Sequence, residues 1–153
     1  MGINLSPDEQ RDFLENAHTM IVTTIRRDGR PSAVPVWFVV VSGSLYFGTP
    51  PTAAKLSHLR RDPRCCVLVE SGEKWRELRA LQWQMDAVIL EPGPEVDAAE
   101  AASERKYDAY RTPFELMPPA AQQHYGESVW MRLEPAGDPV TWDNSKMRLR
   151  DGV

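Results

Sequence analysis

The chain has 153 residues, enough for one domain, residues 1–153, that buries its own core but too few for a separate substrate domain. Its net charge of −4 lacks the basic excess typical of nucleic-acid binding, and no stretch approaches the ~20 apolar residues of a membrane helix. We therefore expect a cytoplasmic protein that binds a small-molecule substrate at a surface or interface, with no nucleic-acid or membrane partner.

The first third of the sequence predicts one helix and three strands. Ser6-Pro7-Asp8-Glu9 has the form of a capping box and predicts an amphipathic helix after it. Thr19–Ile25 is rich in β-branched residues and predicts a strand. The turn signal Asp28-Gly29 joins it to a second strand at about Ser32–Val41. A third strand is predicted at Leu45–Gly48.

The middle of the chain predicts a short helix and two strands. Thr52 is the expected N-cap of the helix, which ends at Asp62-Pro63 because proline disfavours helix in the residue before it. Cys65–Glu70 then predicts a buried strand, in which the adjacent Cys65 and Cys66 point to opposite faces. We expect buried thiols there, and a redox pair is the alternative.

The next predicted strand, Arg79–Leu90, is long and has two faces. The side chains expected on its apolar face are Leu81, Trp83, Met85, Ala87 and Ile89.

The last third predicts an Ala- and Glu-rich helix at Glu95–Tyr110, because Pro113 must end it. Phe114–Tyr125 predicts a turn and at most a short helix, and strands follow at Val129–Glu134 and Val140–Trp142. Strands joined by short turns, with helices inserted between them, predict a mainly β fold: a small antiparallel β-barrel with added α-helices.

The segment between the third strand and its helix gathers groups that suit a phosphate. A helix N-terminus offers free backbone N–H groups, to which the Thr49 and Thr52 hydroxyls and the Lys55 ammonium can add. On spacing alone, an ordinary solvated lysine remains the alternative. His58 follows Lys55 by three residues on one helix face, and it could contact the same anion or bind nothing.

Searches for catalytic motifs find no hydrolase elbow, zinc-protease motif, Walker loop or dinucleotide-binding glycine motif. We assign no catalytic side chain and no metal ligand. A protein whose cofactor supplies the hydride needs little acid–base machinery of its own. The sequence therefore favours cofactor chemistry over hydrolysis.

Three stretches, Gly29–Phe38, Leu45–Thr49 and Lys55–Arg64, carry a family resemblance. The chain resembles the split β-barrel flavin- and deazaflavin-binding proteins related to pyridoxamine 5′-phosphate oxidase, most closely their deazaflavin-dependent branch. The likeness covers nearly the whole chain. It implies an FMN-binding split barrel and a homodimer with the cofactor between its subunits, in which the long strand around Gln82 reaches the cofactor of the partner.

The resemblance also implies roles for individual residues. Lys55 would hold the cofactor phosphate, assisted by Thr49 and Thr52. Proline inside a strand is confined to edges and bulges, and in similar proteins the matching strand runs beneath the cofactor ring. Trp37 and Phe38 are neighbours in this strand, so one of them must face the core, and the sequence leaves open which. The residues expected beside the ring are Ala33, Val34, Pro35, Val36 and Trp37.

The choice of cofactor lies between a deazaflavin, coenzyme F-420, and FMN. Both carry a phosphate, but the deazaflavin continues into a lactyl and glutamyl tail with several carboxylates, and the small Ala53 and Ala54 leave an exit for it. Arginine outnumbers lysine, which often accompanies GC-rich coding and adds a weak pointer to the deazaflavin. We expect an oxidoreductase that transfers a hydride from the reduced cofactor to a small conjugated acceptor. A non-catalytic flavin, deazaflavin or haem carrier is the alternative.

Overall fold

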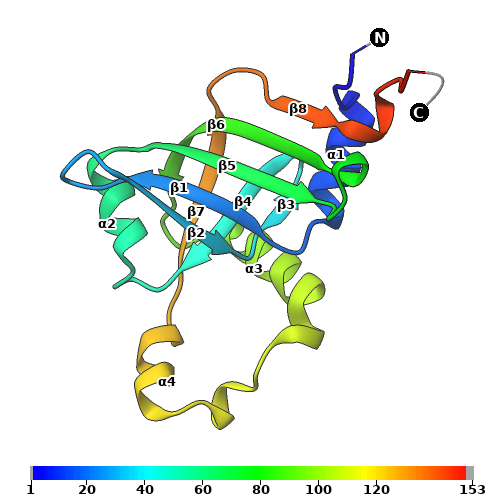
Figure 1. The fold of residues 1–153 in the computed structure, drawn as a ribbon. Coiled ribbons are helices and arrows are strands. Elements are labelled where there is room, and N and C mark those ends of the chain that lie inside the picture. Colours follow the sequence, from blue (N-terminus) through cyan, green and yellow to red (C-terminus); the bar gives the residue numbers. More distant parts are fainter. Residues whose placement is uncertain (1, 151–153) are drawn as a thin grey trace.

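The computed structural model describes residues 2–150 and is built around one eight-stranded antiparallel sheet (Figure 1). The strand order is β2-β1-β5-β6-β7-β4-β3, and β8 pairs with β6. The strands are β1 (Met20–Ile25), β2 (Pro31–Val36), β3 (Val39–Val41), β4 (Ser44–Thr49), β5 (Arg64–Ser71), β6 (Arg79–Ile89), β7 (Val129–Pro135) and β8 (Val140–Asp143).

One helix precedes the first strand, and the others occupy connections between strands. The helices are α1 (Pro7–Asn16), α2 (Ala54–Arg61), α3 (Pro94–Tyr107) and α4 (Pro119–Tyr125), with short 3-10 turns at Trp75–Glu77, Asp108–Tyr110, Phe114–Leu116 and Asn144–Lys146. The expected capping box at Ser6 and Glu9 is present. None of the helices within residues 2–150 is long and apolar enough to cross a bilayer.

The sheet curls around one hydrophobic core, which confirms the expected split antiparallel barrel (Figure 1). The strands at the two ends of this order, β2 and β3, follow one another in the chain. Strand β6 confirms the predicted alternation, because the five apolar side chains expected on one face all belong to the core or pack against it. Core residues from the other strands include Val22, Val36, Phe47, Val67, Val69, Met131 and Leu133.

The predicted second strand, Ser32–Val41, is wrong as one element, because β2 ends at Val36 and β3 begins at Val39. The backbone of Phe38 binds α3 instead of a neighbouring strand. Its N–H donates to the Tyr107 hydroxyl over 2.9 Å, and its carbonyl accepts from Lys106 Nζ, also over 2.9 Å. Phe38 is 1% exposed and Trp37 36% exposed, so Phe38 is the residue that faces the core.

Two helix boundaries also differ from the prediction. Helix α2 begins after Ala53, which makes no side-chain capping bond, so the predicted N-cap at Thr52 is wrong. The Thr52 hydroxyl instead lies 3.2 Å from Nδ1 of His124 in α4. The helix expected at Glu95–Tyr110 ends at Tyr107, and its last three residues form a 3-10 turn.

Helix α3 packs on the outer face of β3, β4 and β7. The shared cluster contains Val39, Tyr46, Ala99, Tyr107 and Trp130. A hydrogen bond of 2.9 Å from the Tyr46 hydroxyl to Glu95 fixes the start of the helix. This docking brings the last turn of α3 to the break between β2 and β3.

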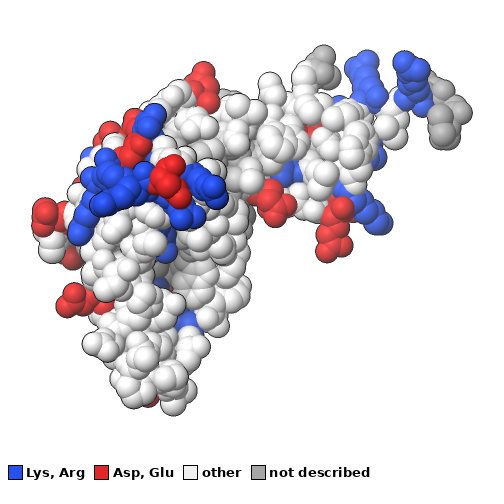
Figure 2. All heavy atoms as spheres, turned by 60° about the vertical axis from the view of Figure 1, so that its left-hand side comes forward, with Lys and Arg blue, Asp and Glu red and all other residues white. Residues whose placement is uncertain are grey.

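Basic side chains are unevenly distributed over the surface. Figure 2 shows Lys and Arg side chains gathered on one part of the molecule, over the β1–β2 turn and the neighbouring end of α2. The chain as a whole carries a net charge of −4, so this gathering is a local positive region on an acidic protein.

Candidate functional site

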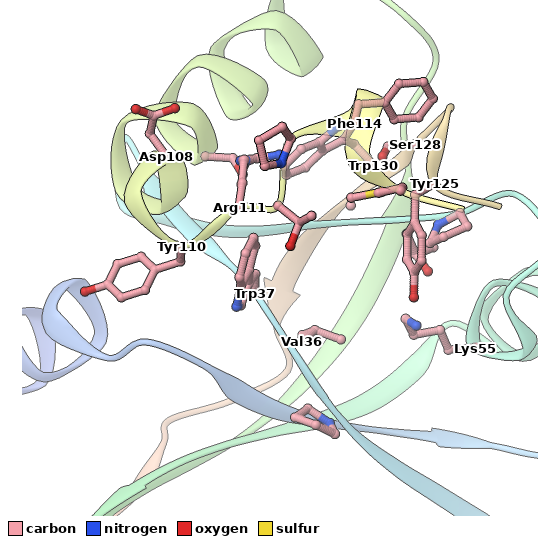
Figure 3. Close-up of a pocket in the computed structure, with 18 residues that line it drawn as sticks. Val36, Trp37, Lys55, Asp108, Tyr110, Arg111, Phe114, Tyr125, Ser128 and Trp130 are labelled. Atoms are coloured by element: carbon pink, nitrogen blue, oxygen red, sulfur yellow. The ribbon is translucent and has the colours of Figure 1, made fainter. Parts of the chain in front are cut away.

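A cavity of about 890 Å³ opens beside the break in the barrel (Figure 3). Its walls come from the end of β2, the end of β4, the first turn of α2, the start of β7 and the segment that joins α3 to β7. The lining includes Pro35, Val36, Trp37, Gly48, Thr49, Lys55, Ser103, Tyr110, Arg111, Phe114, Tyr125 and Trp130.

Lys55 provides a cation at one side of the cavity. Its side chain points into the cavity, and its amine and the Tyr125 hydroxyl point toward one another (Figure 3). Burial lowers the pKa of the Lys55 ammonium. Across the described part of the chain, the ammonium has no carboxylate within 4.0 Å. A half-buried cation without a counter-charge favours an anionic ligand, because it has lost hydration and gained no partner.

Two other residues of the cavity wall have unsatisfied polar atoms. Thr49 Oγ1 and Trp130 Nε1 are buried and have no hydrogen-bond partner among the described residues. Buried polar groups in folded proteins are normally paired. Together with the Lys55 ammonium, these two atoms are polar groups of the cavity wall that lack hydrogen-bond partners in the protein. Such a wall fits a ligand with anionic oxygens.

Gly48 allows the Trp130 indole to lie flat against β4. The two residues are opposite one another in the β4–β7 ladder. A Cβ atom at position 48 would come within 2.9 Å of Trp130 Cε2. This wall of the cavity therefore requires glycine at position 48.

Trp37 forms the wall at the break in the barrel. Its indole stacks on the Tyr107 ring, with centroids 4.4 Å apart and an interplanar angle of 3°. The Arg111 guanidinium lies 5.8 Å from the Trp37 ring centroid, and it also donates to Ser103 Oγ over 2.9 Å. The pocket therefore has a fixed aromatic wall and a second cation, which comes from a different element than Lys55.

The cavity brings together half of the residues that the sequence singled out. Pro35, Val36, Trp37, Thr49 and Lys55 line it. The residues outside its lining are Ala33, Val34, Thr52, His58 and Gln82.

The residues outside the lining have other surroundings. His58 Nδ1 lies 2.8 Å from Thr24 Oγ1 on β1, and its pKa is lowered by burial and by the charges of Arg61 and Arg26. Gln82 is exposed on β6, and Val34 packs against the core. In one chain, these side chains do not converge on the cavity.

Residues 108–128 supply lining residues that the sequence analysis missed. We call this segment the arm, because it leaves the barrel and returns to it at β7 (Figure 1). Within the described chain, residues 112–128 make one hydrogen bond to residues outside this range, between His124 and Thr52. The arm exposes several large apolar or aromatic side chains, Tyr110, Phe114, Leu116 and Tyr125. Its prolines and lack of periodicity gave no sign of a site.

Solved structures of several proteins resemble this fold. A conserved hypothetical protein of Mycobacterium tuberculosis is 26% identical, with a TM-score of 0.80 over 99% of this chain and 94% of the other. An FAD-binding protein of Mesorhizobium loti is 18% identical, with a TM-score of 0.66 over 88% and 90% of the two chains. The haem storage protein of Vibrio cholerae is 15% identical, with a TM-score of 0.65 over 95% and 99%.

The curated proteins include no match to this sequence. The family model described as pyridoxamine 5′-phosphate oxidase matches residues 6–137, a range that holds every strand except β8 and all of the residues that line the cavity. The chain therefore belongs to the pyridoxamine 5′-phosphate oxidase family, whose flavin-binding split-barrel fold it has.

Proposed function

We propose that the protein is an oxidoreductase that uses a reduced deazaflavin, or alternatively FMN, to reduce a small conjugated acceptor. The observation that carries the proposal is the wall formed by Lys55 and Thr49. It combines a half-buried cation that has no carboxylate partner within residues 2–150 with a buried hydroxyl that has no hydrogen-bond partner there. A cofactor phosphate supplies the charge and the acceptor oxygens that this wall lacks.

The side chains of the pocket have binding and orienting roles in this proposal. Lys55 and Thr49 hold the phosphate, and Pro35, Val36 and Trp37 border the ring. When bound, the reduced cofactor supplies a hydride to the acceptor, which takes a proton from solvent while the cofactor becomes oxidised. The protein's contribution is to hold the two reactants together and to exclude water with its aromatic walls.

A homodimer accounts for two of the five sequence-derived residues that lie outside the cavity. Gln82 is exposed on β6 and Ala33 on the edge strand β2, so both are accessible to a second subunit. Of the exposed side chains of the arm, Tyr110, Phe114 and Tyr125 line the cavity, and all of the exposed ones would be covered in such a dimer. We propose that the cofactor lies at the subunit interface, where Gln82 of one subunit approaches the cofactor held by the other.

The deazaflavin is the preferred cofactor because of the exit beside Lys55. Ala53 and Ala54 are small residues at the start of α2, so their own side chains leave room for a tail that continues beyond the phosphate. A titration decides between the cofactors. We expect the deazaflavin to bind at least tenfold more tightly than FMN, about 1.4 kcal/mol, with an affinity that falls as salt rises.

Fluorescence titrations with both cofactors at two ionic strengths provide this measurement. FMN binding as tight as that of the deazaflavin would overturn the choice of cofactor. It would leave the assignment of the phosphate site intact. If neither cofactor bound at micromolar concentration, the proposed function would be wrong.

A carrier that binds the cofactor without turnover is the second candidate. No histidine or carboxylate other than Asp108 lines the cavity among the described residues, so the protein offers few groups for proton transfer. An absorbance measurement distinguishes the enzyme from the carrier. The absorbance of the reduced cofactor is followed after addition of a quinone or an α,β-unsaturated carbonyl compound. Oxidation faster than in a protein-free control supports the enzyme, and bound cofactor that stays reduced with each acceptor supports the carrier.

A further inference from the structure

A second cavity, of about 280 Å³, lies between the end of α1, strand β3 and the end of α3. It shares no lining residue with the cavity of the candidate site. Its lining consists of Glu15, Val39, Val40, Ala102, Arg105 and Lys106. Because β3 contributes only valines, the charged groups that face this cavity are one carboxylate from α1 and two basic side chains from α3.

The amine of Lys106 is held in place by Phe38. Its Nζ donates to the Phe38 carbonyl over 2.9 Å and lies 4.0 Å from the centroid of the Phe38 ring. No carboxylate within residues 2–150 lies within 4.0 Å of this amine. Burial lowers the pKa of the ammonium to about 8. At pH 7.5 about a quarter of the molecules therefore carry a neutral amine at this position, against about one in a thousand for an ordinary lysine.

A neutral lysine amine is a nucleophile, and desolvation is a common way in which proteins activate one. One N–H of the neutral Lys106 amine suffices for the hydrogen bond to the Phe38 carbonyl, which leaves the lone pair of the nitrogen free. Because Lys106 lines the second cavity, a small electrophile that enters this cavity meets the amine.

Arg105 indicates which class of electrophile fits. Its side chain is exposed at the same cavity, and in the described part of the chain no carboxylate lies within 4.0 Å of its guanidinium. Guanidinium groups match phosphate oxygens through paired hydrogen bonds. An acyl phosphate combines an electrophilic carbonyl carbon with a phosphate leaving group, so it suits a cavity that holds both a nucleophilic amine and a guanidinium.

We propose that Lys106 is acylated by small acyl phosphates, whose phosphate group Arg105 binds in the second cavity. The lone pair of Nζ attacks the carbonyl carbon and forms a C–N bond. The bond between this carbon and the phosphate oxygen breaks, and phosphate leaves with the electron pair of that bond. The nitrogen loses a proton to solvent, and the product is an amide. This reaction needs no cofactor, so the inference does not depend on the proposed function.

The modified side chain adjoins the candidate site. Phe38 follows Trp37, which forms the wall of the first cavity at the break in the barrel. The amide keeps one N–H, enough to donate to the Phe38 carbonyl, but the positive charge over the Phe38 ring is lost. Acylation therefore changes a contact of the residue next to this wall.

Mass spectrometry after incubation with acetyl phosphate measures the reaction residue by residue, because the chain has four lysines. Lys74 is the reference, since it is exposed on a loop and lines neither cavity. At pH 7.5 we expect Lys106 to be acetylated roughly tenfold faster than Lys74 or more, because its larger neutral fraction outweighs the lower nucleophilicity of a weaker base. The rate at Lys106 should level off above pH 8, where most of this amine is already neutral.

Two single variants test the part of Arg105. Arg105→Gln removes the guanidinium from the cavity, and Arg148→Gln is the matched control at an exposed arginine near the C-terminus. Each variant is treated with acetyl phosphate and with the N-hydroxysuccinimide ester of acetic acid, which delivers the same acetyl group without a phosphate. We expect Arg105→Gln to slow the reaction of Lys106 with acetyl phosphate about fivefold, the effect of one exposed charge pair. Its reaction with the ester should not change.

Arg148→Gln should react with both reagents as the wild-type protein does, and circular dichroism checks that both variants keep the fold. Acetylation of Lys106 at or below the rate of Lys74 in the wild-type protein would overturn the proposal. So would an acetyl phosphate reaction at Lys106 that is equally fast in Arg105→Gln and Arg148→Gln. The protein is treated without added cofactor, so neither outcome bears on the proposed function.

Discussion

The ring of Tyr107 lies parallel to the indole of Trp37, with centroids 4.4 Å apart, and its hydroxyl binds the backbone of the next residue, Phe38. The hydroxyl accepts from the Phe38 N–H and also lies 2.7 Å from the carbonyl oxygen of His18. One side chain at the end of α3 thus fixes both residues of the break between β2 and β3. Trp37 can form a wall of the cavity because Tyr107 holds it from behind.

Replacing Tyr107 with phenylalanine should separate these two contacts. Tyr107→Phe keeps the ring but leaves the buried Phe38 N–H without its acceptor, so we expect the free energy of unfolding to fall by about 1–3 kcal/mol. Chemical denaturation measures this loss. Tyr110→Phe is the control, because the Tyr110 side chain is exposed. Equal stability of Tyr107→Phe and the wild-type protein would show that the hydroxyl does not hold the break.

Gly48→Ala should disturb the opposite wall. The added Cβ would lie 2.9 Å from Trp130 Cε2, and such overpacking costs about 1–3 kcal/mol. Cofactor affinity should fall as well, because Trp130 lines the cavity. Gly2→Ala adds the same methyl group at an exposed position where the nearest atom would be 3.8 Å away, and it should change stability by about 0.5 kcal/mol at most. Thermal unfolding and titration of both variants provide the comparison, and equal behaviour would contradict the packing argument.

Lys106 should make stability depend on pH in the alkaline range. Burial lowers the pKa of its ammonium from the ordinary 10.5 to about 8. Between these values the unfolded chain binds the proton more strongly than the folded one, so stability gains from this residue as pH rises from 8 to 10.5. Below pH 8 the full cost of burying the charge is present. The stability of Lys106→Met relative to the wild-type protein should therefore fall across this range, and a difference that is independent of pH would contradict the lowered pKa.

Much of the fold could be predicted from local patterns. The alternation in β6 predicted its buried face, because a strand that covers a core on one side must repeat with a period of two. The break at Trp37 and Phe38 could not be predicted in this way. It depends on the hydrogen bonds that Phe38 makes with Lys106 and Tyr107, which lie about 70 positions later and meet Phe38 only after α3 has packed.

The residues of the candidate site also fall into those that local sequence patterns reveal and those that depend on contacts made only in the folded chain. Lys55 and Thr49 could be recognised because the strand end and the helix start that carry them are adjacent in sequence. His58 was also a candidate, but its ring lies beside Thr24, because that side of α2 faces β1. The arm residues Tyr125 and Arg111 reach the cavity by a path that neither periodicity nor a motif marks.

The arm should take part in dimerisation, because its exposed apolar side chains lose contact with water when a second subunit covers them. We expect the wild-type protein to have the mass of two chains by light scattering at micromolar concentration. Leu116→Asp should weaken the dimer, since Leu116 is 74% exposed in the arm. Leu149→Asp, at a residue that is 61% exposed near the C-terminus, is the matched control. A wild-type monomer that binds the cofactor normally would rule out a shared site.

The affinity of Lys55→Ala for FMN tests the phosphate site most directly. Loss of one charged hydrogen bond should weaken binding by about 1.5–3 kcal/mol, roughly 10- to 150-fold. Lys74→Ala removes the same charge from an exposed loop outside the cavity and should bind FMN as the wild-type protein does. Circular dichroism of both variants shows that the fold is kept. An affinity of Lys55→Ala equal to that of Lys74→Ala would contradict the assignment of this wall to a cofactor phosphate.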